Sequence, residues 1–220
     1  NVVINGKALG APTYQFPDIW SRLTFIASYF NLLLGILLIV LITDEFSFRT
    51  IRQQIMDGLS RAEFIQAKFF VILGIAVFST VFLLAMGLYF GLVHSTNVAV
   101  SAVITQLDYL LYFFLQAVAY MTLAMLFAFV IRKIGLAIIA FVAYTKVVEP
   151  LIHFSIDDNL DQYFPMKVLS SLTPMPGQEV LDQLTSATIL LSPVWAAMLT
   201  VVYICLFLAA SYLVIKLRDL

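Results

Sequence analysis

The chain has 220 residues, 62% of them hydrophobic and only 11% charged, and its formal net charge is −1. A soluble domain carries roughly 25% charged residues, so this composition excludes a water-soluble fold, and the near-neutral charge gives no sign of a nucleic-acid partner. The sequence predicts an all-α, polytopic transmembrane helix bundle that occupies residues 1–220 as a single domain among membrane lipids.

The first twenty residues, NVVINGKALGAPTYQFPDIW, are polar and rich in turn formers. They lack the basic-then-apolar order of a signal peptide, and the chain starts at Asn1 rather than at Met. We expect residues 1–20 to form a loop whose upstream part is absent.

Five apolar runs follow, each long enough for the ~20 helical residues that cross a bilayer. They cover about residues 23–42, 69–93, 109–131, 134–154 and 193–217. The runs do not alternate apolar and polar residues, so membrane strands are not expected. Asn31 and Gln116 are predicted to bridge helices, and Gly87 and Gly91 to permit close packing inside the bundle.

Lys and Arg distribution predicts the orientation, because these residues are retained on the cytoplasmic side. If every run crosses, eight basic residues share one side and three the other. The richer side holds Arg49, Arg52, Arg61, Lys68, Arg132, Lys133, Lys216 and Arg218. Residues 1–20 and 155–191 are therefore expected outside and the C-terminus inside. The outer segment 155–191 is expected to contain short interfacial helices.

The stretch DEFSFRTIRQQIMDGLSRAEFIQAKFF, residues 44–70, carries eight charges in 27 residues. Phe48, Ile51 and Ile55 recur at helical spacing and form one apolar stripe. Gly58 suits the left-handed position that ends a helix. We call residues 46–60 the insert, and the pattern predicts a short amphipathic helix there.

A second helix is predicted to start directly after the insert. Ser60 with Glu63 three residues later is a capping box, and Leu59 with Phe64 occupies the positions of a hydrophobic staple. The helix that crosses as 69–93 is therefore expected to begin at Arg61, in water.

The charges decide where the insert lies. A charged side chain at the bilayer centre costs about 2.5–3.5 kcal/mol, so the eight charges of residues 44–70 cannot be embedded, and the insert within this stretch must project on the cytoplasmic side. Two interpretations stay open: an interfacial helix that anchors a loop, or a docking element that transmits movement from a cytoplasmic partner into the bundle.

This stretch resembles the signature of the ABC-2 type permeases, the membrane subunits of one class of ABC exporters. That family has an acidic residue closing the second membrane helix, a Thr-x-Arg element, a turn with Ser-Arg, and then an acidic residue and a Lys. The matching residues are Glu45, Thr50, Arg52, Ser60, Arg61, Glu63 and Lys68. The sequence departs from the family pattern at Arg49, where Gly is common, and at Gly58, where Pro is common.

The resemblance implies a six-helix fold, so the five runs would be the second to sixth helices and a first helix would lie upstream of residue 1. It implies that the insert is a coupling helix seated in an ATPase subunit. The partners implied are two copies of that ATPase, which carry ATP and magnesium, and a second permease chain in a homo- or heterodimer in a prokaryotic cytoplasmic (inner) membrane. The coupling residues implied are Glu45, Phe48, Arg49, Thr50, Ile51, Arg52, Ile55, Gly58, Ser60, Arg61 and Glu63.

The chain has no G-x-x-x-x-G-K-[ST] phosphate loop and no G-x-S-x-G or H-E-x-x-H motif, so we expect no enzyme activity and no cofactor or metal in this chain. His94 and His153 lie at predicted helix ends without a nucleophile or ligand motif nearby. Two alternatives to a permease remain: a non-transporting scaffold or sensor subunit that docks a cytoplasmic partner, and an intramembrane hydrolase, for which no nucleophile is found.

Lys146 and Glu149 lie inside the fourth apolar run and are three residues apart. On an α-helix that spacing puts both on one face, so they are predicted to form an intramembrane polar pair. Ionisable residues within a membrane span are functional candidates, although Lys146 is near enough to the outer end to reach the interface.

Overall fold

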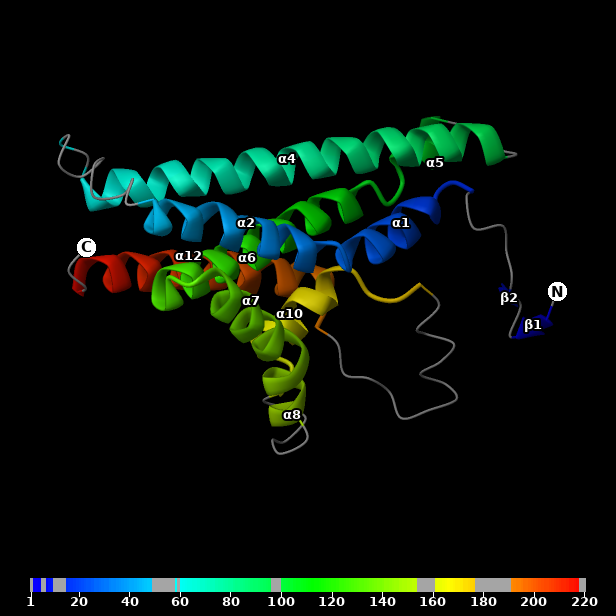
Figure 1. Cartoon of the computed structure of the whole chain (residues 1–220). Coiled ribbons are helices and arrows are strands. Elements are labelled where there is room, and N and C mark those ends of the chain that lie inside the picture. The colour runs from blue at the N-terminus through cyan, green and yellow to red at the C-terminus, as the bar shows by residue number, and fades with distance from the viewer. Residues whose placement is uncertain are drawn as a thin grey trace.

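The computed structural model describes residues 2–4, 7–9, 15–48, 58, 60–95, 100–153, 161–176 and 191–217. Within these ranges the chain is helical apart from a short antiparallel hairpin (Figure 1). The hairpin pairs β1 (Val2–Ile4) with β2 (Lys7–Leu9), so the loop expected for residues 1–20 contains two short strands.

The helices follow the order of the apolar runs, with short additional helices between them. They are α1 (Ile19–Ser28), α2 (Asn31–Ser47), α4 (Arg61–His94), α5 (Val100–Ile104), α6 (Asp108–Ile131), α7 (Ile134–Ala143), the π-helix η1 (Tyr144–Val148), α8 (Glu149–His153), α10 (Pro165–Leu172) and α12 (Pro193–Leu217).

In the described ranges four helical segments are long and apolar enough to cross a membrane, or five when α1 and α2 count as one bent span. The expected all-α bundle is confirmed, and the chain is a membrane protein. One short helix, α10, lies in segment 155–191, and the amphipathic sequence at 179–184 lies outside the described residues.

Helix α6 is the centre of the bundle. Two-thirds of its apolar stretch (67%) is buried, compared with 11% for α4 and 22% for α12. It packs against α2, α4 and α12 (Figure 1). The outer faces of α4 and α12 carry many exposed aliphatic and aromatic side chains, which suits helices in contact with lipid.

The first apolar run is broken rather than straight. Helix α1 ends at Ser28, and the chain bends by 41° before α2. At the break the Ser28 hydroxyl donates to the Phe25 carbonyl (2.6 Å), and the Phe30 amide donates to the Ala27 carbonyl (2.9 Å). These i to i−3 bonds tighten the last turn and turn the axis without Pro or Gly.

Gly87 and Gly91 of α4 mark a close approach to α1 and the residues just before it, as predicted. A Cβ added to Gly87 would lie 2.5 Å from the Trp20 ring, and one added to Gly91 would lie 2.2 Å from the Phe16 ring. The Trp20 indole is held in place because it donates to the Val103 carbonyl at 2.9 Å. The glycines therefore serve packing inside one chain.

The fourth apolar run changes helix type partway along. After α7 the chain forms η1 and then α8, and in Figure 1 this segment turns away from the direction of α4 and α12. Pro150 lacks the amide that would bond to the Lys146 carbonyl, and a π-turn directly before a proline relieves that loss.

Candidate functional site

The structure describes both edges of the insert but not its middle. Glu45 lies in the last turn of α2 and Phe48 follows that helix, exposed by 76%. Gly58 and Ser60 precede α4. The predicted coupling residues Arg49, Thr50, Ile51, Arg52 and Ile55 lie outside the described residues, as does Leu59 of the expected staple.

The predicted capping box is confirmed. The Ser60 hydroxyl accepts from the Glu63 amide (3.2 Å), and the Glu63 carboxylate accepts from the Ser60 amide (2.8 Å). Gly58 has φ of +101°, a left-handed conformation that glycine adopts without strain. Helix α4 therefore begins at Arg61 as expected, with a fixed start.

Arg61 joins the start of α4 to the end of α12. Its guanidinium donates to the carbonyls of Lys216 (2.7 Å) and Ile215 (3.3 Å), 155 and 154 residues away. A positive charge in the first turn is repelled by the positive N-terminal end of its own helix dipole. The same charge stabilises the negative C-terminal end of a neighbouring helix. The position of Arg61 is thus explained by α12 and not by α4.

A second tie joins α4 to α2. The Lys68 ammonium forms an ion pair with the Glu45 carboxylate and lies 5.1 Å from the centre of the Phe64 ring. These two charges belong to the predicted signature, and the structure brings them together. Because both are partly buried, the pair is more protected from salt than an exposed one.

Aromatic rings fill the space beneath these charges. The Phe129 ring of α6 packs against Phe46 of α2 and Phe64 of α4, each at 6.1 Å between ring centres. The Arg132 guanidinium lies 5.1 Å from the Phe46 ring. Ring packing of this kind is worth about 0.5–1.5 kcal/mol per pair beyond buried area, so α2, α4 and α6 meet in one fixed cluster.

The described parts of the basic segments that were predicted to share a side lie at one end of the bundle. Contacts of Arg61, Lys68 and Arg132 place the start of α4, the end of α2, the end of α6 and the end of α12 together. We call this the insert end; in Figure 1 it includes the C-terminal end of α12.

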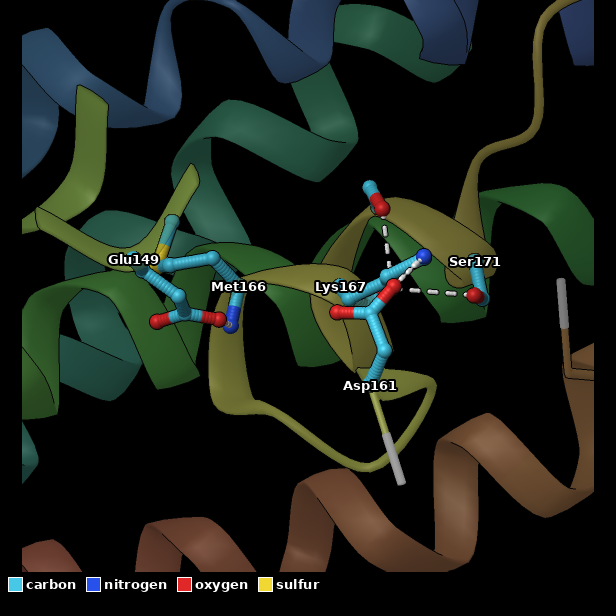
Figure 2. Close-up of polar contacts among 6 residues, drawn as sticks. Glu149, Asp161, Met166, Lys167 and Ser171 are labelled. Carbon is cyan, nitrogen blue, oxygen red and sulfur yellow. Dashed lines mark hydrogen bonds and ion pairs between the residues drawn. The ribbon is translucent and has the colours of Figure 1, made fainter. Parts of the chain in front are cut away.

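Lys146 and Glu149 are not brought together, contrary to the expected pair. The Glu149 carboxylate accepts from the Met166 amide at 2.5 Å, near the start of α10 (Figure 2), while Lys146 lines a cavity. The pair fails because η1 is wider than an α-helix, so a spacing of three no longer stacks the two side chains. Glu149 instead stabilises the N-terminus of α10.

Further contacts fix α10 against the bundle. Asp161 and Lys167 form an ion pair (Figure 2), and the Tyr203 hydroxyl of α12 donates to the Tyr163 carbonyl. The Gln116 amide group of α6 donates to the Leu169 carbonyl at 2.9 Å. Helix α10 is therefore held by α6, α8 and α12.

The predicted bridging role of Asn31 and Gln116 is confirmed. Asn31 of α2 donates to the Gln116 side-chain oxygen of α6 at 3.1 Å, and the Thr173 hydroxyl donates to the same oxygen at 3.3 Å. Both amide side chains are buried. The network links α2, α6 and the segment after α10.

Comparisons of this chain with protein-family models, with curated proteins and with solved structures found no match. Among the residues that the structure describes, no three His, Cys, Asp or Glu side chains lie close enough to hold a metal ion. His94 is exposed, with its Nδ1 atom 3.1 Å from the Phe90 carbonyl. The candidate site that we consider is the insert together with the contacts of Arg61, Lys68 and Phe129 beside it.

Proposed function

We propose that this chain is the membrane permease subunit of an ATP-binding cassette exporter, which couples ATP hydrolysis on a separate ATPase subunit to substrate movement. The observation that carries the proposal is the form of α4. It starts at a capping box beside the insert and runs unbroken for 34 residues. At 1.5 Å per residue the helix is about 51 Å long, and the hydrocarbon core needs only about 30 Å.

The extra length lies where the charges are. The polar first two turns of α4 contain Arg61, Glu63 and Lys68, and the apolar stretch begins at Phe69. A force applied to the insert therefore acts on the same helix that crosses the membrane. The contacts at the insert end support this transmission, because α2 and α12 are bonded to the base of α4 and α6 packs against it.

The proposed orientation places the insert end in the cytoplasm of a prokaryotic cell. Its support is the positive-inside rule together with the gathering of basic segments at that end. Two such chains would pack around a central route, and two ATPases would bind below. Closure of the ATPases on ATP would push residues 46–60 and rock the bundle.

The test uses the full chain purified with its ATPase from native membranes and reconstituted in liposomes. Replacing both Ile51 and Ile55 with Asp removes two of the three residues of the predicted apolar stripe of the insert, and we expect the ATPase to dissociate. Arg61→Ala leaves the insert intact, so the ATPase should stay bound while its stimulation by the permease falls. Lys133→Ala, a basic residue at the same end but outside the insert, is the control and should change neither.

The outcomes separate the two interpretations of the insert. A complex that survives the Ile51 and Ile55 changes shows that the insert is not the docking element. A complex that depends on the insert, but whose ATPase rate is the same with and without the permease, supports the scaffold or sensor alternative and contradicts coupling.

A further inference from the structure

A cavity of about 340 Å³ lies between the α1–α2 break, α6, η1 and the segment from α10 to Met175. Its polar lining consists of Ser28, Gln116, Tyr120, Lys146, Ser170 and Thr173. Ligand pockets begin at about 300 Å³, and one water occupies about 30 Å³ of liquid. The cavity therefore has room for a charged head group and the first part of a chain, but not for a whole two-chain lipid.

Among the described residues that line the cavity, Lys146 is the only charged one. Within the described part of the chain no acidic side chain forms an ion pair with it, and Glu149, three residues later, is bonded to the Met166 amide. The Lys146 side chain is exposed, so its ammonium is accessible to a ligand that enters the cavity. An anion there would form a charge-assisted contact with this ammonium.

The remaining polar groups fit an anion that lies beside Lys146. Gln116 is held by Asn31, Leu169 and Thr173, and these bonds use one of its two amide protons and its oxygen. The second amide proton and the Tyr120 hydroxyl are further donors in the same lining. The bonds to Asn31, Leu169 and Thr173 hold the Gln116 side chain in one position.

The rest of the wall is apolar. Phe25, Leu32 and Pro174 line the cavity, and Tyr29 and Met175 line it while remaining 61% and 48% exposed. Tyr29 lies in the break between α1 and α2, and Met175 lies in the segment after α10. The cavity thus combines one cation, several donors and an apolar rim open to lipid.

The geometry points to a binding site for the anionic head of a membrane amphiphile, a phosphate or carboxylate held by Lys146, with its acyl chain on the rim at Tyr29 and Met175. This site does not depend on the proposed ATPase coupling, because it is built within one chain. Its test needs no transport, so failure of either proposal leaves the other standing.

The test is photolabelling of the full chain in phosphatidylcholine nanodiscs. The probes carry a diazirine on the acyl chain: a phosphatidylglycerol, a fatty acid and a phosphatidylcholine. We expect the phosphatidylglycerol probe, the fatty-acid probe or both to label peptides that contain residues 25–32 or 170–176. The zwitterionic phosphatidylcholine probe should label them weakly. Labelling is repeated in the presence of inorganic phosphate. Displacement of the probe by phosphate would show that the site binds the free ion.

Lys146→Gln should reduce labelling by the anionic probe about tenfold, because losing a hydrogen bond to a charged group lowers the affinity by about that factor. Lys146→Arg should restore it, and Lys133→Gln, at the insert end, should leave it unchanged. Ser170→Trp fills the cavity from an exposed position on α10 and should also abolish labelling, so it carries the test if the Lys146→Gln chain does not fold.

Three results overturn the inference. The first is equal labelling by anionic and zwitterionic probes. The second is labelling that neither Lys146→Gln nor Ser170→Trp reduces, which would mean that Lys146 only extends to the interface. The third is complete displacement by inorganic phosphate at the concentration of the amphiphile, which would assign the site to a free anion.

Discussion

The tie between Arg61 and the end of α12 is the contact through which movement of α4 would reach the last membrane helix. Replacing Arg61 with Ala removes both hydrogen bonds, at 2.7 and 3.3 Å, to the Lys216 and Ile215 carbonyls. The backbone of α4 is not disturbed, because Ala is the best helix former. The change therefore isolates the tie.

The expected magnitude follows from the geometry. A hydrogen bond to a charged group is worth about 1.5–3 kcal/mol when protected, and the favourable interaction with a helix C-terminus about 0.3–1 kcal/mol at a surface. Arg61 is partly exposed, so solvent screening reduces the expected loss of interaction free energy to about 1 kcal/mol. That corresponds to about a fivefold increase in the opening equilibrium of the last turn of α12.

Hydrogen exchange followed by mass spectrometry measures this opening directly. Peptides covering residues 211–217 should exchange about fivefold faster in the Arg61→Ala chain, and Arg61→Lys should be intermediate, because it keeps the charge but not the forked donors. Peptides covering residues 100–107 are the internal control and should not change. Unchanged exchange at 211–217 would show that the tie contributes nothing and would remove it from the proposed transmission.

Gly91→Ala should lower the free energy of unfolding in detergent by about 1–3 kcal/mol, because its Cβ would meet a buried ring. Gly74→Ala, on the same helix with nothing within 4 Å, should stabilise by about 0.5–1 kcal/mol, and equal effects of the two would refute the packing. Ser60→Ala should cost about 1 kcal/mol, seen as faster amide exchange in the first turn of α4; no change there would mean that the capping box is dispensable. A double-mutant cycle of Asn31→Ala and Gln116→Ala should give a coupling energy of about 0.6–1.7 kcal/mol, and strict additivity would contradict the bridge.

Much of the fold is predictable because its signals are local. The apolar runs predict the spans, and the Ser60 and Glu63 pair predicts the start of α4 to the residue. The break at Ser28 has no such signal, since it depends on hydroxyl and amide bonds within one turn rather than on Pro or Gly. The predicted pairing of Lys146 with Glu149 is wrong for a related reason, because α-helical spacing does not hold across a π-turn.

The long-range parts of the candidate site carry no sequence signal. Nothing near Arg61 indicates that its partner is the end of α12, 155 residues later. The aromatic cluster at Phe129 likewise joins three separate helices. Lys68 and Glu45 are both signature residues, but only the packed structure makes them partners.

Site-directed crosslinking at Gln53 tests the coupling proposal most directly. Cys205, which is exposed on α12, is first replaced with Ser, so that Gln53→Cys supplies the single thiol of the chain, and the purified complex is treated with a short bifunctional thiol reagent. Coupling predicts a crosslink from the insert to the ATPase whose yield changes between the ATP-bound and nucleotide-free states. Absence of the crosslink in every nucleotide state, or labelling of the introduced thiol only from outside the cell, would contradict it.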